Sequence, residues 1–266
     1  MERTDCAIVV NSSPKYFYLL DAHFGLLRRY AAACKWPVYL ATEVPDDPAV
    51  RDVVKRYGVQ VLELQDKDAD FLESRLAACE ALPPTVKYIL PLQEDFLLER
   101  PGINETALIE ALAILDSNRL VCSLRLMPCP GPLERPVQMG MNWAVLKHDD
   151  LRFSYQATIW RREVYSIYMK SLVEQAYQLN PTLKPRTPEW NQYAIRVNPA
   201  ETAIGLHCLD ALVPTGIHLC WIRKASWANA VYWCPWPYRP TAIVKGKLEE
   251  WAKELVRREG FTALSV

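Results

Sequence analysis

The sequence predicts an α/β fold built on a mostly parallel sheet flanked by helices, and three observations lead to this prediction. Short apolar runs rich in β-branched residues, beginning with CAIVV at 6–10, are typical of buried strands. Segments with apolar residues at helical spacing alternate with these runs through the first hundred residues. The chain of 266 residues, 50% of them hydrophobic, is long enough to bury the core of one large α/β domain. Such alternation joins parallel strands through helical crossovers.

The expected elements of the first half follow one another in a regular order. Strands are predicted at 6–10, 38–42, 59–64 and 88–92, with a helix in each interval. A first helix face begins at Tyr16, after a turn cluster. Gly58 supplies the C-terminal stop of the second helix, and a pair of prolines ends the third. Beyond Asn104, a good N-cap, the spacing predicts another helix, and alternation over 120–126 predicts a half-buried strand.

The pattern changes after this strand. Residues 127–136 hold four prolines and a glycine, which predicts a long surface loop. A strand is then predicted at 153–159, followed by helices over 161–179, from 187 onward and around 248–256. Eight of the nine tryptophans lie in this second half. We therefore expect one domain over 1–266, with a regularly alternating half at 1–126 and a Trp-rich half at 137–266.

Composition and missing motifs exclude or disfavour several classes of protein. The 31 basic and 31 acidic residues cancel, so no global positive field favours nucleic acid or an anionic membrane. The charged start at 1–6 predicts neither a signal peptide nor a membrane span, and we expect a cytoplasmic protein whose eight scattered cysteines are reduced. No CxxC pair, GxGxxG, GxxxxGK[ST], GxSxG or HExxH motif is present, which disfavours zinc-thiolate, dehydrogenase, P-loop, serine-hydrolase and metalloprotease chemistry.

Polar residues mark the ends of three predicted parallel strands. Ligands of open α/β sheets bind at the carboxyl ends of the strands, which directs attention to Asn11, Glu43 and Gln93. Gln93 is followed by two adjacent acids, Glu94 and Asp95, directly after an apolar run. Carboxylates in this place could hold Mg²⁺ or Mn²⁺ and neutralise a diphosphate leaving group. The alternative is that they open a solvated turn or a helix, whose positive end favours acids.

The order of these features resembles the GT-A class of nucleotide-sugar glycosyltransferases over about residues 6–200. In that class an acidic DXD motif follows the fourth strand, where this sequence has Gln93-Glu94-Asp95, with Gln93 in place of the first acid. The resemblance implies a GT-A-like, Rossmann-like fold, a nucleotide diphosphate sugar as donor, and a divalent Mn or Mg cation bound by Asp95. It places Asn11, Ser12, Glu43 and Glu94 around the donor. It also implies that 1–126 is the nucleotide-sugar-binding half of the domain and 137–266 the acceptor-side half.

Further segments extend this resemblance into the second half. Residues 154–160 and 244–247 are similar to parts of uncharacterised glycosyltransferase-like proteins from bacteria and their phages. In inverting members of the class, an acid near the start of a helix facing the donor acts as base, and Glu189 in TPEWN occupies a comparable place. Alternatively, Glu189 only complements a helix dipole.

Two other features of the second half have both a functional and a purely structural interpretation. Lys245 and Lys247 flank Gly246, which would let them approach donor phosphates, or they belong to an ordinary basic loop. The aromatic stretch at 227–238 could stack on a sugar or a base, or it packs in the core.

The sequence thus predicts a glycosyltransferase that moves a sugar from a nucleotide diphosphate donor to an acceptor hydroxyl with inversion, and retention is the alternative stereochemical outcome. Two alternatives use the same residues: a nucleotidyltransferase, which needs an acid-bound metal at a strand end, and a non-catalytic carbohydrate-binding module. A phage-type enzyme that glycosylates DNA bases is disfavoured by the neutral net charge.

Overall fold

The computed structural model describes residues 2–129, 131, 137–147, 152–179, 212–222, 226, 229–240, 242–244 and 246–261, without the side chains of 175–179. The strands are β1 (Cys6–Asn11), β2 (Val38–Thr42), β3 (Gln60–Glu63), β4 (Tyr88–Gln93), β5 (Val121–Arg125), β6 (Gln138–Met139), β7 (Trp143–Val145), β8 (Thr158–Arg161), β9 (Ile217–Trp221), β10 (Ile243–Val244) and β11 (Lys247–Leu248). The helices are α1 (Leu20–Tyr30), α2 (Pro48–Tyr57), α3 (Phe71–Ala81), α4 (Glu105–Ser117), α5 (Arg162–Leu179) and α8 (Glu250–Arg258), and the 3₁₀ helices are η1 (Pro14–Leu19) and η2 (Ala230–Tyr232).

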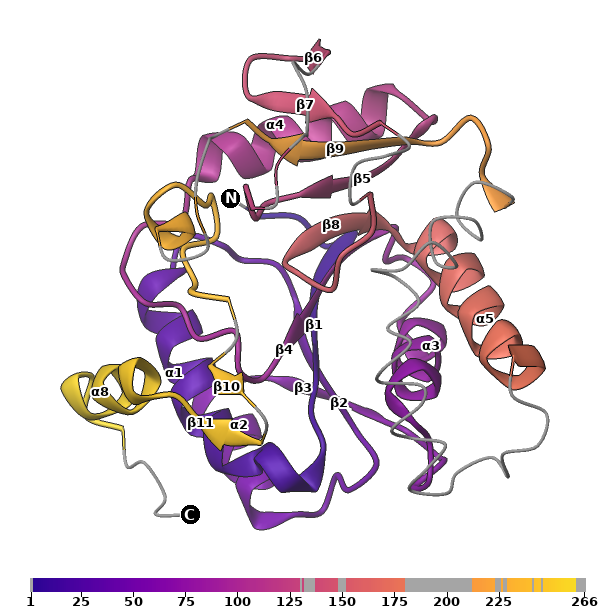
Figure 1. The fold of residues 1–266 in the computed structure, drawn as a ribbon. Coiled ribbons are helices and arrows are strands. Elements are labelled where there is room, and N and C mark those ends of the chain that lie inside the picture. The colour runs from indigo at the N-terminus through magenta and orange to yellow at the C-terminus, as the bar shows by residue number, and fades with distance from the viewer. Residues whose placement is uncertain are drawn as a thin grey trace.

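A nine-stranded sheet forms the middle layer, in the order β3-β2-β1-β4-β8-β5-β9-β7-β6. Helices α1 and α2 cover one face, and α3 and α5 cover the other (Figure 1). Each face has its own hydrophobic core. One core includes side chains of α1, α2, α4 and α8, whereas the other joins α3 and α5 to the aromatic residues before and within β8. The predicted fold class, α/β with a mostly parallel sheet flanked by helices, is confirmed.

The first four strands run parallel, and their register aligns their ends. Asn11, the last residue of β1, pairs with Ala41 of β2 on one side and with Gln93 of β4 on the other. Beyond β4, strand β8 is antiparallel to both β4 and β5. The carboxyl ends of β1, β2 and β4 therefore lie side by side at one end of the sheet.

Several expected boundaries shift for physical reasons. The first α-helix begins at Leu20 instead of Tyr16, because Pro14 opens a 3₁₀ turn that occupies the preceding residues. Strand β5 is buried at every position, not half-buried, because helices and side chains cover both of its faces. The strand expected at 153–159 begins only at Thr158, since Phe153 packs into a cluster of aromatic rings.

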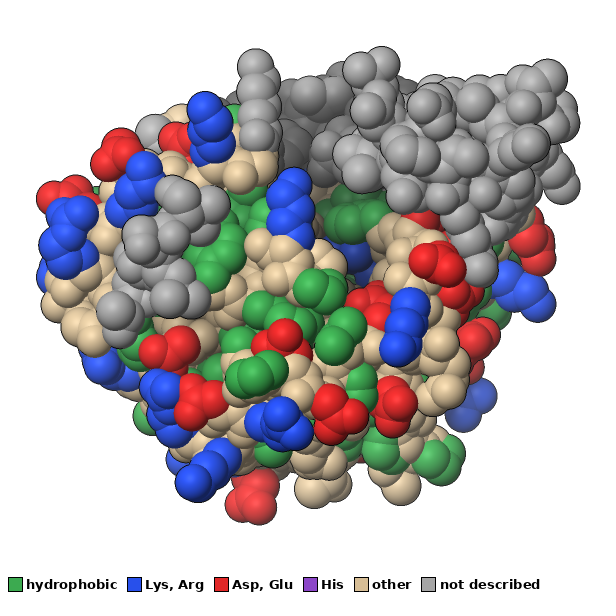
Figure 2. Space-filling view, turned by 90° about the horizontal axis from the view of Figure 1, so that it is seen from below, with side chains coloured by type: hydrophobic (Ala, Val, Ile, Leu, Met, Phe, Trp, Pro, Cys, Tyr) green, Lys and Arg blue, Asp and Glu red, His purple; other side chains and the backbone are tan. Residues whose placement is uncertain are grey.

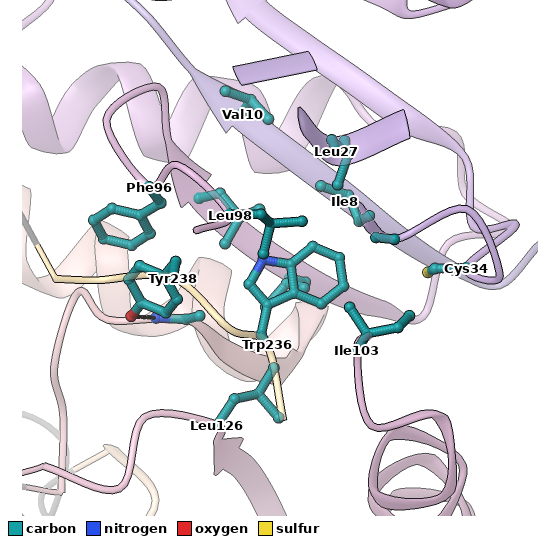
Figure 3. Close-up of a cluster of buried hydrophobic side chains, with 14 of the residues drawn as sticks. Ile8, Val10, Leu27, Cys34, Phe96, Leu98, Ile103, Leu126, Trp236 and Tyr238 are labelled. Atoms are coloured by element: carbon teal, nitrogen blue, oxygen red, sulfur yellow. Dashed lines mark hydrogen bonds between the residues drawn. The ribbon is translucent and has the colours of Figure 1, made fainter. Parts of the chain in front are cut away.

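Part of the aromatic stretch at 227–238 belongs to the core. Trp236 and Tyr238 are fully buried and pack beside Leu98, which follows β4, and beside Ile8 of β1 (Figure 3). The Tyr238 hydroxyl accepts a hydrogen bond from the Ala157 backbone N–H at 2.9 Å, as Figure 3 shows. Core packing therefore accounts for these two rings, whereas Tyr232 and Trp233 are 55% and 49% exposed.

The described cysteines are free thiols, and all of them are buried: Cys6, Cys34, Cys79, Cys122, Cys129, Cys220 and Cys234. Desolvation raises the pKa of the Cys34 and Cys79 thiols to about 11, so they behave as small hydrophobic side chains. In the described part of the chain, no helix has the length and apolar character needed to cross a lipid bilayer.

Two adjacent arginines at the junction of β8 and α5 join the helix ends to the sheet. Arg162 donates hydrogen bonds to carbonyl groups at and after the C-terminus of α3, including those of Cys79 at 3.0 Å, Leu82 at 3.0 Å and Pro83 at 2.7 Å. Arg161 likewise donates hydrogen bonds to carbonyl groups at and after the C-terminus of α4, those of Leu115 and Asn118. The positive charges also face the negative ends of both helix dipoles.

We predict that Arg162→Ala lowers the free energy of unfolding by roughly 3 kcal/mol, because it leaves several partly buried carbonyl groups without donors. Urea unfolding followed by circular dichroism measures this change. The neighbouring Glu163→Ala, an exposed position, is the control and should change stability by about 0.5 kcal/mol or less. Equal stability of the two variants would contradict the capping role.

Candidate functional site

A pocket of about 310 Å³ opens at the carboxyl ends of β1, β2 and β4. Figure 2 looks onto this end of the molecule, where the surface is hollowed and both acidic and basic side chains surround the hollow. The residues that line the pocket are Asn11, Ser12, Ser13, Pro14, Tyr16, Ala41, Glu43, Lys67, Ala69, Asp70, Phe71, Ser74, Arg75, Gln93 and Glu94.

The chain topology explains why a pocket forms here. After β1 the chain adds β2 and β3 on one side, and it then crosses over to place β4 on the other side of β1. The connections that leave β1 and β4 therefore diverge, and a crevice remains between them. Open α/β sheets bind their ligands at such switch points.

Polar groups at the strand ends face this crevice. Asn11 donates from Nδ2 to the Ser74 carbonyl at 3.4 Å, and the buried Ser12 Oγ has no hydrogen-bond partner among the described residues. Burial raises the pKa of the half-buried Glu43 carboxyl, and hydrogen bonds from its own backbone and from Ser74 oppose the rise. These groups could bind the hydroxyl and amide edges of a ligand.

The second turn of α3 contributes a buried cation, Arg75. Its guanidinium lies 3.3 Å from the centre of the Phe71 ring and 5.5 Å from that of Tyr155, and Nη1 donates to the Phe71 carbonyl at 3.0 Å. Only 6% of Arg75 is exposed, and burial lowers its pKa, although a guanidinium stays protonated. No carboxylate of the described residues forms an ion pair with it.

The sequence analysis did not identify Arg75, although the sequence contains a signal for it. Arg75 falls on the apolar stripe of α3, one helical turn from Leu72 and from Cys79, where a charged residue is unusual. The N-terminus of the same helix is already capped, because Asp70 accepts hydrogen bonds from the N–H groups of Leu72 and Glu73. Positive charge at this wall therefore comes from Arg75 and, at the exposed rim, from Lys67.

The residues after β4 form a tight turn, which we call the acid turn and define as 93–96. The Phe96 N–H donates to the Gln93 carbonyl at 3.0 Å, and the Glu94 side chain between them lines the pocket at 8% exposure. Desolvation raises the pKa of Glu94 to about 8, with a smaller contribution from the charge of Asp95. Behind the turn, Nδ1 of the buried His23 lies 3.1 Å from the Glu94 carbonyl oxygen, so Nδ1 carries the proton and donates.

Asp95 points in a different direction from Glu94. It is 7% exposed and is not among the residues that line the pocket. Its Oδ2 accepts a hydrogen bond from the Ile243 N–H at 3.2 Å, and Oδ1 is buried without a partner among the described residues. Burial raises the pKa of this carboxyl, and hydrogen bonding from the backbone of Ile243 and Ala242 opposes the rise.

The structure brings four of the eight sequence-predicted site residues together in one pocket: Asn11, Ser12, Glu43 and Glu94. Asp95 lies directly behind them, and Lys247 is exposed on β11. Glu189 and Lys245 lie outside the described residues. Among the described residues, no group of three or more His, Cys, Asp and Glu side chains is arranged to hold a metal ion.

Comparisons with known proteins show distant similarity of fold. No protein-family model matches the chain, and no curated protein matches it. Staphylococcus aureus TarS is similar with a TM-score of 0.47 and 10% identity, over 84% of this chain and 36% of TarS. A TarS 1–349 structure in complex with UDP-GlcNAc gives 0.42 and 13%, over 73% of this chain and 53% of that one.

Another similar structure is 4-diphosphocytidyl-2C-methyl-D-erythritol synthase from Anaerococcus prevotii, with a TM-score of 0.39 and 11% identity over 74% of this chain and 99% of that chain. This chain thus spans about a third of the TarS structure and 62% of the TarS 1–349 structure without ligand. At these TM-scores and identities the similarities indicate no particular function.

We predict that Glu94 makes the stability of the protein depend on pH. The folded state keeps the Glu94 proton up to about pH 8, whereas the unfolded chain loses it near the ordinary pKa of a glutamate, 4.5. The folded state therefore binds more protons in this window, and the free energy of unfolding falls as the pH rises through it. Glu94→Gln should flatten the fall, as measured by urea unfolding at several pH values.

Glu63→Gln, an exposed position on β3, is the control and should follow the wild-type dependence. If the wild type and Glu94→Gln lose stability in parallel between pH 4.5 and about 8, Glu94 is not the buried acid responsible.

Proposed function

We propose that this chain is a glycosyltransferase that binds a nucleoside diphosphate sugar in the pocket at the ends of β1, β2 and β4 and transfers the sugar to an acceptor hydroxyl. The observation that carries this proposal is the buried guanidinium of Arg75 in a switch-point pocket at polar strand ends. It forms no ion pair with a described carboxylate, and Glu94 and Asp95 act on it only through their charge. A desolvated cation is costly unless an anion compensates it, and a diphosphate supplies that anion.

The parts of such a donor match different walls of the pocket. Arg75, and Lys67 at the rim, face the negative diphosphate. Asn11 and Ser12 at the end of β1 and Glu43 beyond β2 offer donors and acceptors for the nucleoside. The pocket size, about 310 Å³, is at the lower end of the range of small-molecule sites. In this proposal residues 1–126 hold the donor and 137–266 contribute the acceptor side of a single domain.

The acid turn fits a divalent cation in one respect. The Asp95 Oδ1 atom is buried and lacks a partner among the described residues, and Glu94 adds a second carboxyl beside it. Mg²⁺ or Mn²⁺ usually takes one or two carboxylates and completes its shell with phosphate oxygens and water. Asp95 with Glu94 would hold the ion, which would neutralise the negative charge of the diphosphate.

The transfer step is assigned to Glu189 on the resemblance to inverting enzymes. The Glu189 carboxylate would take the proton of the acceptor hydroxyl while that oxygen bonds to the anomeric carbon. The bond from this carbon to the diphosphate oxygen breaks on the opposite side, and the electron pair leaves with the diphosphate. Lys245 and Lys247 are proposed to approach the departing phosphates.

We predict that a nucleoside diphosphate raises the melting temperature of the protein, since a ligand that binds the native state stabilises it. UDP, ADP, GDP and CDP should be compared by thermal shift with and without Mn²⁺. Arg75→Gln should weaken the affinity for the best of them by about tenfold or more, the value of a charge-assisted hydrogen bond.

Arg119→Gln is the matched control, because this substitution changes the net charge by the same amount. Arg119 is exposed before β5, at the end of the sheet opposite the pocket. No stabilisation of the wild type by any of the four nucleotides would overturn the proposed function. Analysis of the products then separates sugar transfer from nucleotidyl transfer, because the latter joins phosphorus to the acceptor.

We predict that Glu189→Gln lowers kcat by about 10²- to 10⁴-fold while donor affinity is retained, because glutamine cannot accept the proton. Turnover and the urea midpoint should be measured on the same preparation. A residue that only complements a helix dipole would instead change stability by about 0.3 to 1 kcal/mol and leave kcat unaltered.

A further inference from the structure

The short hairpin formed by β10 and β11 lies at the same end of the sheet as the pocket (Figure 1). Ile243 and Val244 pair in antiparallel fashion with Leu248 and Lys247. Gly246 turns the chain with a φ of +76°, in the left-handed region that favours glycine. The Glu249 N–H donates to the Ala242 carbonyl at 2.8 Å and closes the base of the hairpin.

The first contact of the hairpin is with the acid turn. The Ile243 N–H donates to Asp95 Oδ2 at 3.2 Å, although the two residues are 148 positions apart in the sequence. Because Asp95 is buried, this hydrogen bond forms where water competes poorly, and it involves a charge-bearing group. One carboxylate oxygen is thus held by the hairpin, and the direction of the other oxygen is fixed.

The second contact of the hairpin is with the segment after β1. A Cβ added at Gly246 would lie 3.5 Å from Lys15 Nζ, so the turn of the hairpin lies against that ammonium group. Lys15 is in η1 between Pro14 and Tyr16, both of which line the pocket, and its Nζ lies 5.2 Å from the centre of the Tyr16 ring. The hairpin therefore lies beside the segment that supplies Pro14 and Tyr16 to the pocket, and it also bonds to the acid turn, which supplies Glu94.

We propose that the β10–β11 hairpin is a positioning element of the candidate site, with Asp95 as the positioning residue that anchors it. By bonding to Asp95 and lying against Lys15, the hairpin fixes the segments that follow β4 and β1. Without it, the Asp95 carboxylate would lose the backbone N–H that fixes the direction of its oxygens. The effect on ligand binding rests on the proposed function, whereas the coupling between hairpin and acid turn does not.

The test perturbs the hairpin away from the pocket. Gly246→Val places a β-branched residue at a positive φ and should loosen the turn, and Asp95→Ala removes the anchor. Val244→Thr is the control, because it lies on the same hairpin, is 43% exposed and keeps a β-branched side chain. Amide hydrogen exchange of the full chain without ligand is measured at 242–248 and at the acid turn.

We expect Gly246→Val to increase exchange at the Phe96 amide of the acid turn, and Asp95→Ala to increase exchange at 242–248, each by about tenfold or more. Val244→Thr should exchange like the wild type at both segments. If loosening the hairpin leaves the acid turn unchanged, or if Asp95→Ala leaves 242–248 unchanged, the inference is overturned. Circular dichroism shows whether either Gly246→Val or Asp95→Ala fails to fold. If one of them does, the exchange result of the other variant decides whether the hairpin and the acid turn are coupled.

A second experiment, which measures nucleotide binding, separates this inference from the proposed function. Gly246→Val should weaken the affinity for the nucleoside diphosphate that stabilises the wild type most, by about tenfold, both with and without Mn²⁺. Failure of the wild type to bind any of UDP, ADP, GDP and CDP refutes the proposed function. The hydrogen-exchange experiment still decides whether the hairpin holds the acid turn. Unchanged affinity in a Gly246→Val protein with a loosened acid turn refutes the positioning role.

Discussion

The burial of β1 is the constraint on which the arrangement of the site depends. Every residue of this strand is buried, so its backbone N–H and C=O groups must find partners within the sheet. Strands β2 and β4 supply them on the two sides, and the resulting register sets Ala41, Asn11 and Gln93 level with one another. The chain can become polar only where the strands end, and the polar side chains of all three therefore gather at one crevice.

The crevice combines groups whose charged forms are expensive to bury. Arg75 retains its charge and is stabilised by the Phe71 ring and carbonyl, whereas the buried Glu94 carboxyl keeps its proton to about pH 8. His23 is also kept neutral, with a pKa lowered by burial to about 4, and its Nδ1–H holds the Glu94 carbonyl. Arg75 thus supplies buried positive charge to the pocket, which is also lined by a Glu94 carboxyl whose charged form burial disfavours, and this combination suits an anionic ligand.

Contacts between distant segments join the elements at both ends of the sheet. Arg161 and Arg162 fasten the ends of α4 and α3 to the C-terminal end of β8, opposite the crevice, and at the crevice Asp95 fastens the C-terminal hairpin to the acid turn. Each contact joins a side chain to backbone groups of another element. Such bonds are specific because the carbonyl or N–H concerned has no helical or sheet partner of its own.

The sequence by itself determined the order of strands and helices over the first hundred residues, because periodicity and turn chemistry are local properties. It also placed Asn11, Ser12, Glu43 and Glu94 in one site, since polar residues that end parallel strands must meet at the same edge of the sheet. Only the tertiary structure decided that β8 lies between β4 and β5, that Arg75 is buried in the pocket, and that Asp95 bonds to Ile243. These three features depend on which distant segments pack together. The free energy of that packing is a sum over the whole core, so no single position in the sequence reveals it.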